Sequence, residues 1–240
     1  MDKLSEQLYA LDADINKLDY LQICEYGNNK IFYDSLLNIQ KYSMIVLTSM
    51  NGAEIFLKHF KKLKIDIRKL GNVKFAVIGN GTGEILEKAG IYPDIIPEIY
   101  TAKELGKRIA ETVSETDKLL ILRAEKGSSD LTDVLDKSGI LYDDIKIYDV
   151  KMNNKKEYDE KINSNFITFA SSSGVNAFFE NGFSLSDSTE IICIGEVTSQ
   201  ALIKKGIDKF YISDIQNVQG IIDTILREVK NEQIQTYESE

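Results

Sequence analysis

The feature that most constrains the fold of this chain is an internal repeat. Residues 75–91 align with residues 191–207 without a gap, and the two segments share glycine, threonine, leucine and lysine at matching positions. Upstream, residues 45–53 align with residues 167–175 at a slightly larger spacing. A third, weaker match pairs Leu4 and Leu8 with Leu131 and Leu135, and residues 21–24 with residues 145–148. Three matches in the same order indicate that the chain arose by duplication.

Apolar strand-sized runs alternate with segments of helical periodicity along the whole chain. Strands are predicted at residues 44–47, 74–78, 94–96, 119–122, 144–148, 166–169, 191–194 and 210–212. Helices are predicted at residues 3–11, 51–62, 82–89, 102–112, 131–137, 174–180, 198–205 and 218–230. This alternation is typical of βαβ units with parallel sheets. Together with the repeat it predicts two similar α/β lobes that face each other across a cleft.

The two halves of the repeat differ at their beginnings. In the second half, the helix at residues 131–137 follows the strand at residues 119–122 and a polar turn. The first half begins almost directly with the helix at residues 3–11. We therefore expect its leading strand to be missing.

Composition excludes several classes of partner. The net charge of −9 argues against nucleic acid, because binding a phosphate backbone requires a basic stripe. The longest apolar runs, such as residues 75–79, are far shorter than a membrane span, and the first six residues contain no apolar signal segment. Cys24 and Cys193 are isolated, without metal-ligand spacing, which suits a reducing compartment. A cytoplasmic protein without nucleic-acid or membrane partners is expected.

Seven short motifs occur in a characteristic order. They are Thr-Ser-x-Asn-Gly at 48–52, Val-Ile-Gly-x-x-Thr at 77–82, Pro-x-x-Tyr-Thr-Ala-x-x-Leu at 97–105, Leu-Arg at 122–123, Ile-x-Ile-Tyr at 145–148, Ser-Ser-Ser-Gly-Val at 171–175 and Ile-Gly-x-x-Thr at 194–198. In this order and spacing, the chain resembles the uroporphyrinogen-III synthase family from about Leu4 to Arg227. The resemblance implies two flavodoxin-like parallel-sheet lobes that are interleaved in sequence. Lobe A would comprise residues 1–22 and 152–240, lobe B residues 25–149, with crossing segments near Ile23 and Val150.

The resemblance also implies a reaction. The substrate would be hydroxymethylbilane, which is dehydrated and cyclised to uroporphyrinogen III with inversion of ring D, in heme, cobalamin and siroheme biosynthesis. The pyrroles supply the electrons, so no cofactor and no metal is expected, and positioning carries the specificity. A monomer is expected, with transient contact to the preceding pathway enzyme. The chain's own acidity opposes binding of a polyanion at long range.

Candidate substrate-binding residues lie in turns that follow strands and open helices, where backbone N–H groups and hydroxyls can bind carboxylates. They are Thr48, Ser49, Asn51, Gly79, Thr82, Tyr100, Thr101, Ser171, Ser172, Ser173, Gly195 and Thr198. The alternative is that the polar residues among them only cap helices.

Tyr148 is the family-matched candidate for a general acid, and the alternative is a core tyrosine. Arg123 is a candidate carboxylate ligand, and the alternative is an ordinary salt bridge. His59, the only histidine, lies outside every motif and is expected to be structural. The glycine-rich segment at residues 79–83 has neither a following lysine nor a correctly spaced acidic residue, which argues against a dinucleotide site.

Two other classes of function remain open. A non-catalytic two-lobed module descended from the same family would bind a small molecule in the same cleft. A flavodoxin-like electron carrier would need an aromatic-flanked flavin phosphate loop, which the sequence does not contain.

Overall fold

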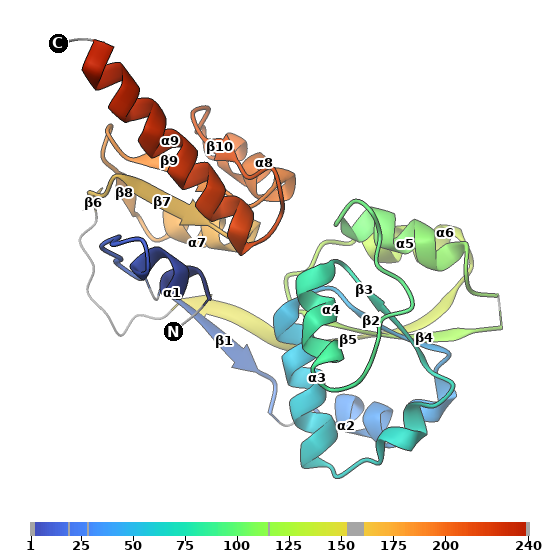
Figure 1. Ribbon diagram of the computed structural model, residues 1–240. Helices are drawn as coiled ribbons and strands as arrows, with labels where there is room; N and C mark the ends of the chain where they lie inside the picture. Colours follow the sequence, from blue (N-terminus) through green and yellow to red (C-terminus); the bar gives the residue numbers. More distant parts are fainter. Residues whose placement is uncertain (1–2, 19, 28, 115, 153–160, 239–240) are drawn as a thin grey trace. The chain divides into compact units, whose positions relative to one another are not determined.

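The computed structural model describes residues 3–18, 20–27, 29–114, 116–152 and 161–238, without the side chains of Met152 and residues 232–238. The chain forms two compact units. Unit 1 comprises Met1–Gln22 with Met152–Glu240, and unit 2 comprises Ile23–Lys151. Both contain parallel strands and covering helices (Figure 1), so the predicted α/β fold class is confirmed.

Unit 2 is built on a five-stranded sheet in the order β1-β5-β4-β2-β3. The strands are β1 (Leu21–Glu25), β2 (Met44–Leu47), β3 (Lys74–Val77), β4 (Lys118–Ala124) and β5 (Leu141–Met152). Strand β2 pairs in parallel with β3 on one side and β4 on the other. All four of its residues are buried, because helices cover both faces of the sheet.

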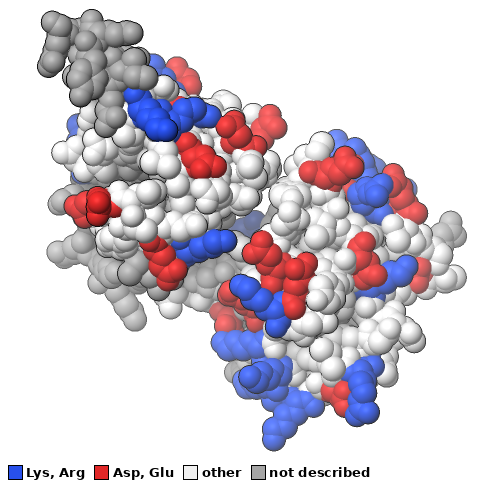
Figure 2. Space-filling view, in the orientation of Figure 1, with Lys and Arg blue, Asp and Glu red and all other residues white. Residues whose placement is uncertain are grey.

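The helices of unit 2 divide between the two faces of this sheet. Helices α2 (Lys30–Leu37), α3 (Met50–Lys62) and α4 (Asn80–Glu87) pack one core, with Phe32, Phe56 and Leu86 fully or almost fully buried. Helices α5 (Ala102–Ala110) and α6 (Asp130–Lys137) pack the other face. Two short 3₁₀ helices, η1 (Ile39–Lys41) and η2 (Ile67–Leu70), complete the unit. Basic residues end α3, and Figure 2 shows a blue group at the lower end of unit 2, where Figure 1 places the end of this helix.

Unit 1 is built on a three-stranded parallel sheet in the order β10-β9-β7. The strands are β7 (Phe166–Phe169), β9 (Glu190–Cys193) and β10 (Tyr211–Ile212), and a separate pair consists of β6 (Lys161–Ile162) and β8 (Ser184–Leu185). Helices α7 (Ser172–Glu180) and α8 (Glu196–Lys204) contact each other, as do α1 (Lys3–Tyr9) and α9 (Val218–Glu238). An aromatic core around Phe178 joins Phe169, Phe183 and Tyr20.

The duplication extends to backbone angles. Ser49 precedes α3 with φ −163° and ψ 155°, and Ser171 precedes α7 with φ −163° and ψ 153°. Gly90 and Gly206 follow α4 and α8 with φ of +79° and +81°, in the left-handed region that glycine adopts without strain. The two units therefore repeat the same strand–turn–helix geometry.

Some expectations differ from the structure. The predicted strand at residues 94–96 forms only an isolated parallel bridge between Ala76 and Ile95, because Pro93 and Pro97 bracket the segment and remove backbone donors. Helix α2 and the pair β6–β8 were not predicted. The first described element is α1. In the described ranges, none of the helices is long and apolar enough to cross a membrane.

The raised pKa values of two buried tyrosines, Tyr20 and Tyr42, lead to a prediction of how stability depends on pH. Burial raises the pKa of Tyr20 to about 12, and burial with a hydrogen bond to Asp143 raises that of Tyr42 to about 12. An unfolded tyrosine ionises near pH 10, so the folded state holds these protons more tightly. Their contribution to stability is complete below pH 10 and is lost as the pH rises towards 12.

The urea midpoint is therefore expected to fall between pH 9 and pH 11.5, and to fall less in Tyr42→Phe. Equal slopes against pH in the wild type and in Tyr42→Phe would contradict the assignment to Tyr42.

Candidate functional site

The polar turns predicted in unit 2 lie at the carboxyl ends of neighbouring strands. Thr48 and Ser49 follow β2, and Ile78 and Gly79 follow β3, which pairs directly with β2. The Ser49 Oγ accepts a hydrogen bond of 3.0 Å from the backbone N–H of Gly52, which caps α3. The turns are therefore adjacent, and the start of a 13-residue helix faces this edge of the sheet.

Tyr148 joins this site through an irregularity in β5. The register of the β4–β5 pair shifts after Arg123, so that Lys146 opposes Arg123 and Tyr148 opposes Ala124. Ile147 is thus the extra residue of a bulge, and both Ile147 and Tyr148 are buried in the α2–α3–α4 core. The Tyr148 Oη lies 2.8 Å from the Ser49 Oγ, so the bulge directs the phenol to the turn that caps α3.

The phenol of Tyr148 is held in its neutral form. Burial raises its pKa above the ordinary value, and hydrogen bonds with Ser49 and Asn51 offset only part of that rise. The side chain is 3% exposed. At neutral pH the group therefore carries its proton, and its neighbours are the polar residues Ser49 and Asn51.

Gly79 and Tyr100 are brought together in the same unit. A Cβ added at Gly79 would lie 2.9 Å from the ring of Tyr100, so glycine is required for close approach. Thr101 caps α5 by accepting a hydrogen bond of 3.2 Å from the N–H of Glu104. Thr82 is buried and donates its N–H to the carbonyl of Gly79 within the first turn of α4.

The turn that opens α7 in unit 1 repeats the arrangement around Ser49. The Ser171 Oγ accepts a hydrogen bond of 3.1 Å from the N–H of Gly174. The Ser173 Oγ lies 3.5 Å from the Ser171 Oγ. Ser171 and Ser173 are exposed, and Ser172 is partly exposed. The hydroxyls of this turn are thus accessible, as a carboxylate site requires.

Three residues near these turns were missed by the sequence reasoning. Tyr20 donates its hydroxyl to the carbonyl of Gly174, 3.0 Å away, and no motif pointed to it. Gln216 packs against Gly195, and Asn217 caps α9 by accepting from Gly220 N–H at 2.9 Å. Gln216 lies 116 positions after Tyr100, and Asn217 lies 116 positions after Thr101. Gly195 follows Gly79 at the same spacing, so the internal repeat could have identified Gln216 and Asn217 as the counterparts of Tyr100 and Thr101. Thr198 is buried, like Thr82.

This equivalence yields a matched pair of variants. Gly79→Ala places a methyl group against the rigid ring of Tyr100, whereas Gly195→Ala places one 2.8 Å from the flexible side chain of Gln216. We expect Gly79→Ala to lower the unfolding free energy by about 1–3 kcal/mol, since overpacking has this cost. Gly195→Ala is expected to cost less than half as much, because Gln216 can rotate away. A larger loss in Gly195→Ala, measured by urea unfolding, would contradict this view of the two turns.

Arg123 is engaged within the protein. Its guanidinium forms two hydrogen bonds to Asp144, of 2.9 and 2.7 Å, and a third to the carbonyl of Ser128. Burial raises the pKa of the Asp144 carboxyl, but hydrogen bonds from Arg123 and Lys146 outweigh it and hold that pKa below its usual range. This arrangement matches the salt-bridge interpretation, and a role in substrate binding stays a prediction.

His59 lies in the interior of unit 2, as expected for a structural residue. It is 4% exposed, packs against the rings of Phe32 and Tyr33, and places Nε2 3.2 Å from Glu25. Over the described ranges, no three His, Cys, Asp or Glu side chains are grouped so that they could hold a metal ion.

The fold and these paired turns define a class of two-unit α/β proteins built by duplication. The family model described as uroporphyrinogen-III synthase HemD matches residues 2–223. The chain belongs to this family.

Similar proteins agree with this assignment. The chain is 29% identical over 231 residues to the porphyrin biosynthesis protein HemD of Ruminiclostridium josui, covering 93% of this chain and 45% of that protein. It is 27% identical over 180 residues to a uroporphyrinogen-III synthase of Chlorobaculum parvum, covering 71% and 73% of the two chains. The chain therefore spans less than half of the first relative and most of the second.

A solved structure shares the fold. The uroporphyrinogen-III synthetase of Helicobacter pylori superposes with a TM-score of 0.64 at 20% identity, over 90% of this chain and 93% of that one. A mutant uroporphyrinogen III synthase from Thermus thermophilus superposes with the same TM-score at 14% identity, over 95% and 94%.

Proposed function

We propose that this chain is a uroporphyrinogen-III synthase in tetrapyrrole biosynthesis. It would dehydrate hydroxymethylbilane and close it to uroporphyrinogen III with inversion of ring D, without cofactor or metal. Membership of the family supports this proposal, as do the names of the relatives. The observation that carries it is the serine-capped helix start that both units repeat, around Ser49 and Ser171.

These two helix starts suit the substrate, a linear tetrapyrrole rich in carboxylates. The first N–H groups of a helix have no intrahelical acceptors, and the helix dipole favours an anion there. Ser49 and Ser171 each satisfy one such N–H and leave the neighbouring ones to a ligand. Because the donors are fixed in the fold, they offset the long-range repulsion from an acidic chain.

Tyr148 is assigned the role of general acid. Loss of the hydroxymethyl oxygen as water requires a proton as the C–O bond breaks, and the pyrrole nitrogen supplies the electron pair to form an azafulvenium. The substituted carbon of ring D then attacks this centre to give a spiro intermediate, and rearrangement with loss of a proton leaves the inverted macrocycle. A phenol with a raised pKa is protonated at neutral pH and can donate, and solvent restores its proton afterwards.

The remaining assignments of the proposal follow the family. In unit 2, Thr48, Asn51, Gly79, Thr82, Tyr100 and Thr101 would bind the substrate with Ser49. In unit 1, Ser172, Ser173, Gly195 and Thr198 would do so with Ser171. The protein would act in the cytoplasm as a monomer, in transient contact with the enzyme that supplies its unstable substrate. Lobe A at residues 1–22 and 152–240 and lobe B at residues 25–149 would each contribute one of the serine-capped starts.

The experiment is to supply freshly made hydroxymethylbilane and to separate two products. The type I product forms by closure without inversion of ring D, and the type III product is uroporphyrinogen III. The proposal predicts predominantly type III, formed faster than the spontaneous closure in buffer. Only type I at the spontaneous rate would overturn it. In that case saturable binding of the oxidised product, uroporphyrin III, would favour the non-catalytic binding module, and the catalytic proposal would be abandoned.

A further inference from the structure

A cavity of about 440 Å³ lies at the opposite edge of the unit 2 sheet from the turns described above. Ser43 precedes β2, Lys74 opens β3 and Asp117 precedes β4, so the amino ends of three adjacent strands border it. Tyr42 and Val73 are buried and contribute apolar surface to its lining. The cavity shares no residue with the candidate substrate site.

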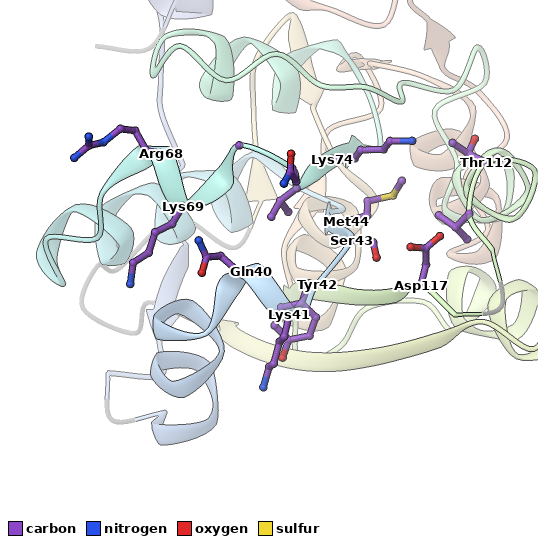
Figure 3. A pocket seen from close by; sticks show the side chains of 14 residues that line it. Gln40, Lys41, Tyr42, Ser43, Met44, Arg68, Lys69, Lys74, Thr112 and Asp117 are labelled. Atoms are coloured by element: carbon purple, nitrogen blue, oxygen red, sulfur yellow. The ribbon is translucent and has the colours of Figure 1, made fainter.

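The lining of this cavity is cationic, although the chain as a whole carries a net charge of −9. Four basic side chains line it, against a single carboxylate: they are Lys41, Arg68, Lys69 and Lys74, against Asp117. Figure 3 shows Lys69 and Lys41 with Gln40 between them on one side, and Lys74, Thr112 and Asp117 on the other. A second hollow adjoins at Lys74 and Thr112 and adds Arg108 and Asp94.

Most of the other charges here already have partners. Arg68 pairs with Asp66 at 2.5 Å, and Lys41 lies 5.1 Å from the centre of the Tyr42 ring. Asp117 accepts hydrogen bonds from the N–H and hydroxyl of Ser114, at 2.8 and 2.9 Å. Hydrogen bonds from Ser43 and Ser114 hold the Asp117 pKa below its usual range, so its negative charge is fixed in the wall.

Lys69 and Lys74, like Lys41, form no ion pair with a carboxylate of the described residues. Their charges act on carboxylates only at longer range: beside the hydrogen bonds from Arg68, Lys69 helps to lower the pKa of Asp66, and beside the hydrogen bonds from Ser43 and Ser114, Lys74 helps to lower the pKa of Asp117. Lys74 opens a strand, and Lys69 belongs to a four-residue 3₁₀ helix, so neither serves to balance the dipole of a long helix. Like charges that surround a cavity repel one another, and an anion between them would remove that repulsion.

We propose that this amino-edge cavity binds a small multivalent anion, such as a phosphorylated or polycarboxylated metabolite, with Lys69 and Lys74 as its main ligands. The volume is within the range of small-molecule sites. Lysine ammonium groups bind phosphate and carboxylate oxygens as point charges without demanding one geometry. The cavity is separate from the proposed synthase site, and its occupancy does not depend on synthase activity.

Calorimetric titration tests this proposal, with inorganic pyrophosphate as the phosphate probe and tricarballylate as the carboxylate probe, at low salt. Saturable binding of at least one probe is expected. Lys69→Gln with Lys74→Gln should weaken it at least tenfold. Lys204→Gln with Lys209→Gln removes the same charge from exposed positions of unit 1 and should change the affinity less than twofold.

Binding of neither probe at millimolar concentration would overturn the proposal. So would binding that survives Lys69→Gln with Lys74→Gln, or that weakens equally in the control pair, since either result would place the anion elsewhere. Because both altered lysines are exposed, the variants are expected to fold, and circular dichroism checks this. A wild-type affinity retained in Ser49→Ala separates this cavity from the proposed substrate turns.

Discussion

Replacement of Arg123 with methionine is expected to lower the unfolding free energy of unit 2 by about 3 kcal/mol. The substitution keeps much of the side-chain volume but removes both hydrogen bonds to Asp144 and the one to Ser128. Removing one partner of a buried ion pair typically costs about 3–5 kcal/mol, because the other charge is left uncompensated. We expect a loss at the lower end of that range, because Lys146 remains 2.7 Å from Asp144 and still pairs with it.

The control for this prediction removes both charges. Arg123→Met combined with Asp144→Leu should recover at least half of the lost stability, because the part-buried Asp144 carboxylate, which keeps only Lys146 as an ion-pair partner in the single variant, is then removed. Urea unfolding of the single and double variants measures the difference. If Arg123→Met left stability unchanged and instead raised KM for the bilane, Arg123 would be a substrate ligand and the structural interpretation would be wrong.

Tyr148→Phe is expected to reduce the rate of type III formation about 100-fold, at the lower end of what a general acid contributes. The spontaneous type I product should then dominate, since closure without inversion needs no acid from the protein. Stability should fall by only about 1 kcal/mol, the cost of one hydrogen bond with Ser49. Below pH 10 the wild-type rate should not fall through ionisation of Tyr148, because the pKa of this phenol is raised.

Tyr42→Phe is the matched control for this experiment. Tyr42 is also buried, but it lies just before the amino end of β2, on the opposite edge of the sheet from Ser49. Its hydroxyl contacts Ser35 and Asp143. Its removal should leave the isomer ratio unchanged. A Tyr148→Phe protein that is as stable as expected and still forms type III at the wild-type rate would exclude Tyr148 as the acid.

Local patterns explain why much of the fold and the two serine turns could be predicted. Ser49 and Ser171 each accept from an N–H three residues later, so a short motif contains the whole interaction. The burial of β2 on both faces likewise follows from its unbroken apolar run. Gly90 and Gly206 mark helix ends through their own backbone angles.

The remaining features depend on contacts between distant parts of the chain. Tyr148 reaches Ser49 only because of a bulge in β5, and periodicity alone would place it on the other face. The partner of Arg123 lies on the neighbouring strand, 21 positions along the chain. Tyr20 meets Gly174 across 154 positions, with no motif around it. The residues at the turns could therefore be predicted from the sequence. The side chains and carbonyls that they contact could not, because those contacts depend on strand register and on distant parts of the chain.

The most direct test is the ratio of type III to type I product from fresh hydroxymethylbilane, measured with wild type and with Ser49→Ala combined with Ser171→Ala. The wild type should yield mainly type III. The double variant loses two helix caps, at about 1 kcal/mol each, and should remain folded while its ratio moves strongly towards type I. A wild-type protein that gives only type I at the rate of buffer alone would contradict the account, and so would a folded double variant with an unchanged ratio.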